Sequence, residues 1–197
     1  MAGAHEKLEE AEHAQHAAGH NKHIALLIAV LALGLAFSET FGKSAQTDSI
    51  SLNIKASDTW NFFQAKTIRQ TSLRTAAEAF ALQVPAAPNE EARAAMEKQI
   101  ETWRATIARY ESDPKEKDGR KELRAQAEEY ERKRDTQLAR YHHYEVASAA
   151  YQIGIVLASA GVITGMMVLP LLGVALGVLG IAFTGIGLFA PHAVHLL

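Results

Sequence analysis

Apolar residues along this chain gather into two blocks on either side of a long charged segment. The first block, Ile24 to Phe37, carries no charge, and its helical pattern continues to residue 43. The second block, residues 146–190, is too long for one membrane crossing and right for two, because a crossing helix needs about 20 apolar residues. We therefore expect an all-α membrane protein with three transmembrane helices. These are residues 22–43, 146–166 and 170–190.

The second and third of these helices should be separated by a turn, since Gly165 and Pro170 bracket it. Two tails flank the expected helices. The N-terminal tail, residues 1–21, is rich in His and Glu, and the C-terminal tail is residues 191–197. A signal peptide begins with basic residues, whereas this N-terminal tail is acidic, so we expect the first apolar block to be retained.

Small residues recur at helix-packing spacing in each expected membrane helix, which lets helix backbones approach closely in lipid. They are Ala25, Ala29, Ala32 and Ala36, then Ala150, Gly154, Ala158, Gly161 and Gly165, then Gly173 and Gly177. We expect close packing of these helices, and the spacing leaves open whether it occurs within one chain or between chains.

The charged middle, residues 44–145, is predicted to be a soluble coiled coil. Residues 43–145 carry 18 basic and 17 acidic side chains, so their charge is nearly balanced. Apolar residues three and four positions apart make a coiled-coil seam. They include Leu73, Ala77, Phe80 and Val84, then Met96, Ile100, Trp103, Ile107 and Tyr110, then Leu123, Ala127 and Tyr130.

Two proline-containing segments, residues 85–89 and 113–119, must interrupt this helical pattern. At 1.5 Å per residue the helix before the first break is roughly 60 Å long beyond residue 43, and the two after it together are roughly 70 Å long. Since the chain returns to the bilayer by Val146, we predict a long antiparallel coiled-coil hairpin. Its tip is residues 85–89, and Asn89 or Glu90 opens the next helix.

Residues 55–68, Lys-Ala-Ser-Asp-Thr-Trp-Asn-Phe-Phe-Gln-Ala-Lys-Thr-Ile, carry a recognisable motif. The segment resembles the signature of an uncharacterised bacterial membrane family, the domain-of-unknown-function 4337 family. The likeness extends to the plan of one span, a helical middle and two C-terminal spans. The resemblance implies a bacterial inner-membrane setting and brings no established activity.

Six motif side chains are candidates for helix packing or for gripping a partner: Asp58, Trp60, Phe62, Phe63, Gln64 and Lys66. Packing is the favoured interpretation, with Ser57 or Asp58 alternatively capping a new helix after a kink. Thr67 and Gln70 lie on the face that carries Trp60, Phe63 and Leu73, where they interrupt the apolar pattern with polar side chains. Such positions either fix the register of a coiled coil or are simply half exposed.

Glu39 is the one carboxylate within an expected membrane helix, where an ionisable group suggests function. The simpler interpretation is an ion pair with Lys43 one turn away, near the membrane surface. If several chains met around the first span, Glu39 residues would form an acidic ring of the kind found in cation pores.

Four N-terminal histidines, spaced three, four and three residues apart, share one face of a helix: His13, His16, His20 and His23. Such spacing allows weak binding of a divalent transition metal, with Glu9 or Glu12 adjacent. The alternative is a solvated approach to the first span. We expect no other cofactor.

Arg132, Lys133, Arg134 and Arg140 form a basic approach to the second apolar block and are predicted to contact anionic lipid. The same charges favour a cytoplasmic hairpin and a periplasmic N-terminus in the inner membrane.

The chain has no cysteine, a net charge of -2 and none of the common nucleotide, serine-hydrolase or zinc-protease motifs. We therefore expect no enzymatic activity, no nucleic-acid partner and no identifiable small-molecule substrate. The expected function is a membrane-anchored coiled-coil scaffold or accessory subunit that contacts the bilayer and either itself or another membrane protein. The alternatives are an oligomeric ion channel or transport component using Glu39, and a metal-responsive sensor using the N-terminal histidines.

Overall fold

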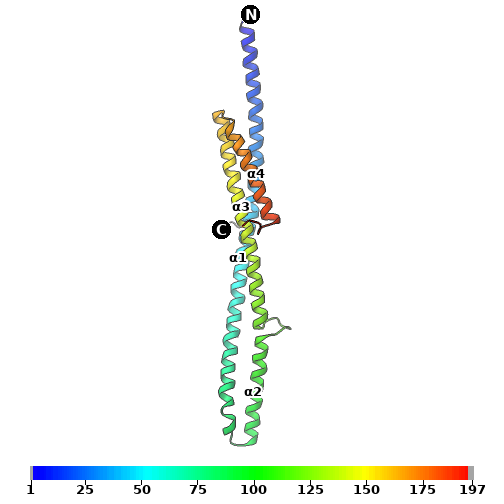
Figure 1. The fold of residues 1–197 in the computed structure, drawn as a ribbon, viewed down its shortest axis with the longest axis vertical. Helices are drawn as coiled ribbons and strands as arrows, with labels where there is room; N and C mark the ends of the chain where they lie inside the picture. Colours follow the sequence, from blue (N-terminus) through cyan, green and yellow to red (C-terminus); the bar gives the residue numbers. More distant parts are fainter. Residues whose placement is uncertain (1, 195–197) are drawn as a thin grey trace. The chain divides into compact units, whose positions relative to one another are not determined.

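The computed structural model is all-α over the part of the chain it describes, the backbone of residues 2–194 and the side chains of residues 22–194. Four α-helices and one short 3-10 helix follow one another (Figure 1): α1 (Ala2–Ala81), η1 (Val84–Ala86), α2 (Glu90–Glu111), α3 (Arg120–Thr164) and α4 (Val168–Phe189). No strand occurs in these described segments. Helices α1, α3 and α4 each contain a segment long and apolar enough to cross a membrane, which confirms the expectation of three such helices.

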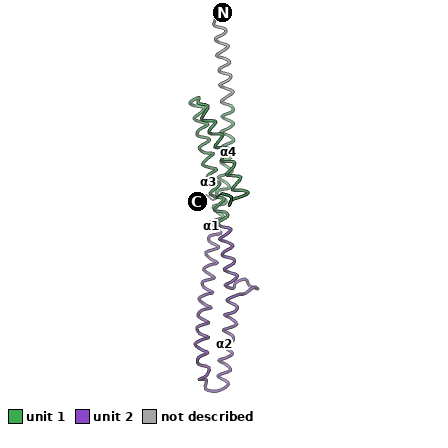
Figure 2. Tube along the Cα trace, viewed as in Figure 1, with its two compact units in different colours: residues 1–48, 135–197 green, residues 49–134 purple. Residues whose placement is uncertain are grey.

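The chain divides into two compact units (Figure 2). Unit 1 comprises residues 1–48 and 135–197, and unit 2 comprises residues 49–134. The long helices α1 and α3 contribute to both units. The apolar segments that could cross a membrane therefore lie in unit 1, and the charged middle of the sequence lies largely in unit 2.

Both predicted breaks are present in unit 2. Helix α1 ends at Ala81, three residues earlier than expected, and η1 carries the chain through Pro85. Asn89 then caps α2, its side chain accepting a hydrogen bond from the Ala92 amide at 2.8 Å. This bond satisfies one of the amides that a helix start leaves unpaired, which explains why the helix begins there. The second break separates α2 from α3 at residues 112–119.

In unit 2, α1 packs against α2 and then against the start of α3. Three pairs show the direction: the tilted rings of Phe80 and Trp103 have centroids 5.5 Å apart, Gln70 contacts Ile107, and Trp60 contacts Glu131. Because the α1 residue number falls as the partner number rises, α1 runs antiparallel to both partners. Apolar positions on the inner face of these helices are buried, namely Ala56, Ala77, Ile100, Leu123 and Ala127.

In unit 1, α1, α3 and α4 pack around Tyr151, which is 4 % exposed. A Cβ added at Gly34 of α1 or at Gly180 of α4 would lie 2.8 or 2.7 Å from the Tyr151 ring. Both glycines therefore leave the space that the ring fills. The Ser38 hydroxyl donates a buried hydrogen bond of 2.9 Å to the Tyr144 carbonyl, joining α1 to α3, a type of polar contact that links helices within lipid.

The turn between α3 and α4 differs slightly from the prediction. It is confined to residues 165–167, with Gly165 in a left-handed conformation (φ 70°) that favours glycine. Helix α4 begins at Val168, two residues before the expected start. Pro170 is tolerated in the first turn because amides there have no partner within the helix.

Candidate functional site

The family motif on α1 meets the end of α2, the loop 112–119 and the start of α3 in one group of side chains within unit 2. We call this group the motif cluster. Helix α1 contributes Trp60, Phe63, Lys66, Thr67 and Gln70, and the later elements contribute Tyr110, Glu111, Asp118, Arg120 and Glu131. Because Lys66, Thr67 and Gln70 fall three and four positions apart, one face of α1 presents them together.

Lys66 lies at the centre of the motif cluster and is only 6 % exposed. Its Nζ pairs with the Asp118 carboxylate at 2.7 Å. The same ammonium lies 5.5 Å from the centre of the Phe62 ring and 5.1 Å from that of Tyr110, within the range of cation–π attraction. A lysine is rarely buried unless it is paired, and here Asp118 from the loop provides the countercharge.

Arg120, the first residue of α3, joins all three helices of unit 2. Its guanidinium donates to Thr67 at 2.9 Å, to Gln70 at 2.6 Å and to Glu111 at 2.8 Å. It also lies over the Phe63 ring, 5.2 Å from its centre. The planar guanidinium, with five donors in a fixed geometry, suits such a convergence of acceptors.

Gln70 and Trp60 extend the motif cluster along α1. Gln70 is buried, and its amide donates to the Ile107 carbonyl at 3.2 Å and to Glu111 at 3.1 Å. The Trp60 indole donates to Glu131 at 2.9 Å and packs edge-on against Phe63. Gln70 is therefore buried and hydrogen-bonded rather than half exposed.

The loop 112–119 is held by its own hydrogen bonds as well as by Lys66. Glu122 accepts from the Ser112 hydroxyl at 2.6 Å and from the Asp113 amide at 3.2 Å. The Ser112 hydrogen bond lowers the pKa of Glu122. Gly119 is buried against Ser112 and Asp113, where a side chain would collide with the loop backbone.

Glu111 gives the motif cluster a predicted pH dependence. The hydrogen bond from Gln70, with Arg120 nearby, lowers the pKa of Glu111 below its ordinary value of 4.5. Because the pKa of Glu111 is lower in the folded state, its ionised carboxylate stabilises unit 2. This contribution is complete above pH 4.5 and is lost as pH falls through the lower pKa of the folded state. We expect unit 2 of Glu111→Gln to lose less stability than the wild type between pH 6 and pH 3. Urea unfolding of the two proteins measures this difference, and equal losses would contradict it.

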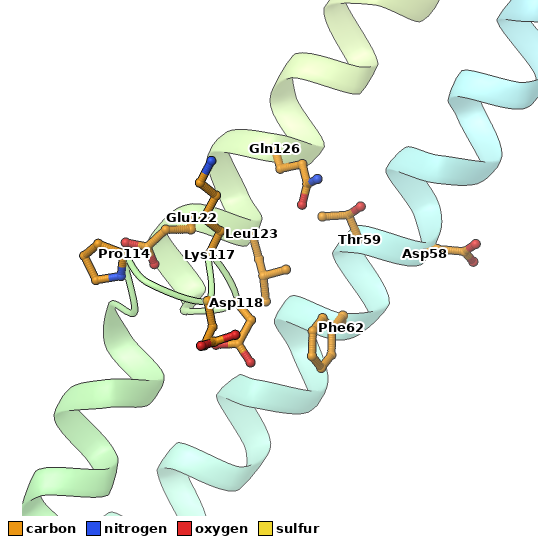
Figure 3. A pocket seen from close by; sticks show the side chains of 10 residues that line it. Asp58, Thr59, Phe62, Pro114, Lys117, Asp118, Glu122, Leu123 and Gln126 are labelled. Carbon is orange, nitrogen blue, oxygen red and sulfur yellow. The ribbon is translucent and has the colours of Figure 1, made fainter.

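A groove of about 790 Å³ borders the motif cluster, between α1, the loop and α3 (Figure 3). Leu123 points from α3 toward Phe62 and Thr59 on α1. Acidic side chains occupy much of the lining: Asp58, Glu116, Asp118 and Glu122, beside Lys117.

The structure divides the six predicted motif residues into two sets. Trp60, Phe63 and Lys66 make the internal contacts of the motif cluster. Asp58, Phe62 and Gln64 are exposed, although Phe62 also covers Lys66. Helix α1 continues through the motif without a break, so the alternative in which Ser57 or Asp58 caps a new helix is wrong.

Sequence reasoning missed the partners of the motif: Glu111, Asp118, Arg120 and Glu131. The polar gap at Gln70 was the available signal that a charged group had to face this part of α1. The motif cluster joins α1 to the end of α2, to the loop 112–119 and to the start of α3. Its two cations, Lys66 and Arg120, are both paired with carboxylates.

Glu39 has a different partner from the one predicted. It accepts a hydrogen bond from Gln152 of α3 at 3.2 Å, and its side chain is exposed. No ion pair between Glu39 and Lys43 is present among the described residues. The two residues are one turn apart on α1, but the Glu39 carboxylate is directed to α3 instead.

The predicted metal face lies largely outside the described side chains, since His13, His16 and His20 are not among them. His23 is described and is exposed. Among residues 22–194, no group of three or more His, Asp or Glu side chains is arranged to hold a metal ion.

The four predicted lipid-contact residues differ in their surroundings. Arg132 and Lys133 both pair with Glu129, and Arg134 donates to Asn53 at 3.2 Å. Arg140 has no hydrogen bond or ion pair within the described part of the chain, and its Nε atom is buried.

Comparison with known proteins matches residues 20–190 to the family model described as "Domain of unknown function (DUF4337)". Searches of curated proteins and of solved structures found no match. The matched region contains the motif cluster, the groove and the three apolar segments. Because it spans most of the sequence, the chain belongs to the DUF4337 family.

Proposed function

We propose that this protein is a membrane-anchored, non-enzymatic scaffold or accessory subunit that associates with copies of itself. Unit 1 would anchor it through three transmembrane helices, and the antiparallel helices of unit 2 would form a coiled-coil hairpin outside the bilayer. One observation carries the proposal: α1 has a second, exposed face with the residue spacing of a coiled-coil seam.

This second face, the outer stripe, runs along α1 to Leu82, the residue just after the helix, with alternating steps of four and three residues. It comprises Ile54, Asp58, Asn61, Ala65, Ile68, Ser72, Thr75, Ala79 and Leu82. Only Ala65 is half-buried, and the others are exposed. Ile68 is 67 % exposed and Leu82 is 83 % exposed. Beyond Asp58 the outer stripe carries no charge, whereas Arg69, Arg74 and Glu78 lie beside it.

The outer stripe lies opposite the face that packs inside unit 2. Ile68 precedes the buried Gln70 by two residues, and two residues rotate a helix by about 200°. The motif cluster therefore cannot cover it. Large exposed apolar side chains at heptad spacing, here Ile54, Ile68 and Leu82, are typical of a helix that packs against a partner helix.

A second copy is the partner that the outer stripe fits best. Two copies anchored in the same membrane with the same orientation would bring their α1 helices together in parallel. Asn61 would then face its own counterpart, and an asparagine within a coiled-coil seam fixes the register of parallel helices. The small side chains at Ser72 and Ala79 would allow close approach, and the Thr75 hydroxyl could hydrogen-bond across the interface.

The small-residue faces in unit 1 support the same conclusion. Gly154 and Ala158 of α3 pack against Gly173 of α4 within the chain, and all three are buried. By contrast, the four alanines of the first apolar block are exposed: Ala25, Ala29, Ala32 and Ala36. Among the residues that the structure describes, none covers this face, so it is available for contact with another copy.

The experiment that tests self-association is native mass spectrometry of the full chain in detergent micelles. Ile68→Glu places a charge in the outer stripe, so we expect it to lower the oligomer population by at least about tenfold, since burying an unpaired charge costs several kcal/mol. Ala95→Glu adds the same charge at an exposed site on α2 and should leave the distribution unchanged.

A wild type that is monomeric at every concentration would contradict self-association. An oligomer unaffected by Ile68→Glu would show that the outer stripe is not the interface. A closed ring of four or more copies would instead favour the pore hypothesis, which ion-flux measurements on Glu39→Gln would then examine.

The proposed topology can be measured because the chain has no cysteine. Ser112 is half-buried and bonded to Glu122, so its exposed neighbour Lys115 is the better reporter in the loop. If unit 2 is cytoplasmic, an impermeant thiol reagent should label Ala4→Cys but not Lys115→Cys in intact cells. Labelling of only Lys115→Cys would reverse the topology.

A further inference from the structure

A small groove in unit 1 lies beside the last charged residues before the apolar block. Its volume is about 200 Å³. The lining combines apolar side chains with polar and charged ones: Phe41, Ser44, Ala45, Asp48, Gln137, Arg140, Tyr144 and Leu188. Under the proposed membrane insertion, on which this inference rests, the groove would lie at the level of the lipid headgroups, because Glu145 is the last charged residue of the chain.

Arg140 and Asp48 share this groove but do not pair with each other. No ion pair within 4.0 Å joins them, and neither has another hydrogen bond or ion pair within residues 22–194. The Arg140 Nε is fully buried without a partner. A buried polar group left unpaired is costly, so the buried Nε of Arg140 calls for a hydrogen-bond acceptor. Asp48 is exposed, and its carboxylate is open to a cation carried by the same ligand.

The surrounding residues favour a lipid as the source of that ligand. Phe41 and Leu188 are exposed apolar side chains that also line the groove, so they could contact acyl chains. Ser44 and Gln137 add hydrogen-bonding groups near the charges. Arginine suits a phosphate because its fork of N–H donors matches phosphate oxygens.

We propose that the groove binds the headgroup of an aminophospholipid, with the phosphate on Arg140 and the primary ammonium on Asp48. Phosphatidylethanolamine carries both groups. Phosphatidylglycerol offers the phosphate without a cation, and the methylated ammonium of phosphatidylcholine cannot donate N–H hydrogen bonds to Asp48.

The test uses the full-length protein in nanodiscs made from equal parts of these three lipids, followed by native mass spectrometry of the lipids it retains. Wild type should retain phosphatidylethanolamine about tenfold over the other two, the factor that one charge-assisted hydrogen bond provides. Arg140→Gln should lose this retention. Asp48→Asn should keep phosphate binding but no longer prefer phosphatidylethanolamine over phosphatidylglycerol.

Arg124→Gln, which removes the same charge from an exposed position on the same helix, is the matched control and should behave as wild type. Equal retention of the three lipids by wild type, or equal losses in Arg124→Gln and Arg140→Gln, would overturn the proposal. Displacement of the lipid by an equal concentration of soluble phosphoethanolamine would overturn the lipid as the source. Circular dichroism checks that each variant is folded.

Failure of the inference can be distinguished from failure of the proposed function. Alkaline carbonate that extracts the wild-type protein from membranes would refute the membrane anchor itself. A protein that resists extraction but shows no lipid preference would leave the anchor standing and refute only the headgroup site.

Discussion

Tyr151→Ala is expected to destabilise unit 1 by about 3 kcal/mol, the range found when a large buried aromatic side chain is removed. The Tyr151 ring fills the space that Gly34 and Gly180 leave between α1, α3 and α4. Leu31 and Ala147 form the buried cluster with it, and Leu27, Leu35, Ile155 and Phe183 pack around them. The backbones at Gly34 and Gly180 cannot easily move inward to fill the cavity that the alanine leaves, because both glycines belong to long helices.

Thermal unfolding followed by circular dichroism in detergent micelles measures this effect. Ile153→Ala is the matched control: it shortens a side chain two residues away that is 53 % exposed. In lipid or detergent that side chain exchanges one apolar environment for another, so its loss should cost little. Tyr151→Phe keeps the ring and should remain close to wild type. Equal effects of Tyr151→Ala and Ile153→Ala would show that Tyr151 does not organise the packing.

Lys66→Met is expected to destabilise unit 2 by about 2–3 kcal/mol. Removing one member of a buried ion pair costs about 3–5 kcal/mol, and the cost is smaller here because the Asp118 side chain is 38 % exposed and can regain water. Methionine retains an apolar stem of similar length. The loss therefore comes from the charge that holds the loop and from its contacts with the Phe62 and Tyr110 rings.

Urea unfolding followed by tryptophan fluorescence reports on this unit, because both tryptophans of the chain, Trp60 and Trp103, lie in unit 2. Lys55→Met removes the same charge from an exposed position at the start of the motif and should change stability by less than about 0.5 kcal/mol. If the two variants unfold alike, Lys66 has no role beyond that of a surface charge.

The helices and their ends were largely predictable because they depend on local chemistry. Three apolar segments, the proline-containing breaks and the Asn89 cap all follow from residues close together in the sequence. The predicted start of α4 was wrong by two residues, because proline is tolerated anywhere in the first turn of a helix. The motif itself was visible as a pattern, and its packing role for Trp60, Phe63 and Lys66 was the favoured interpretation.

The partners of those residues depended on the tertiary structure. Helical periodicity determines which face a side chain occupies, but the alignment of one helix against another is set by the sum of many contacts along both. Lys66 and Asp118 are separated by 52 residues, and Trp60 and Glu131 by 71. The same reason explains why Glu39 meets Gln152 rather than Lys43, and why Arg140 and Asp48 come to share a groove. The sequence by itself determined the helices and their apolar segments, and only their packing decided which charged groups are paired with one another.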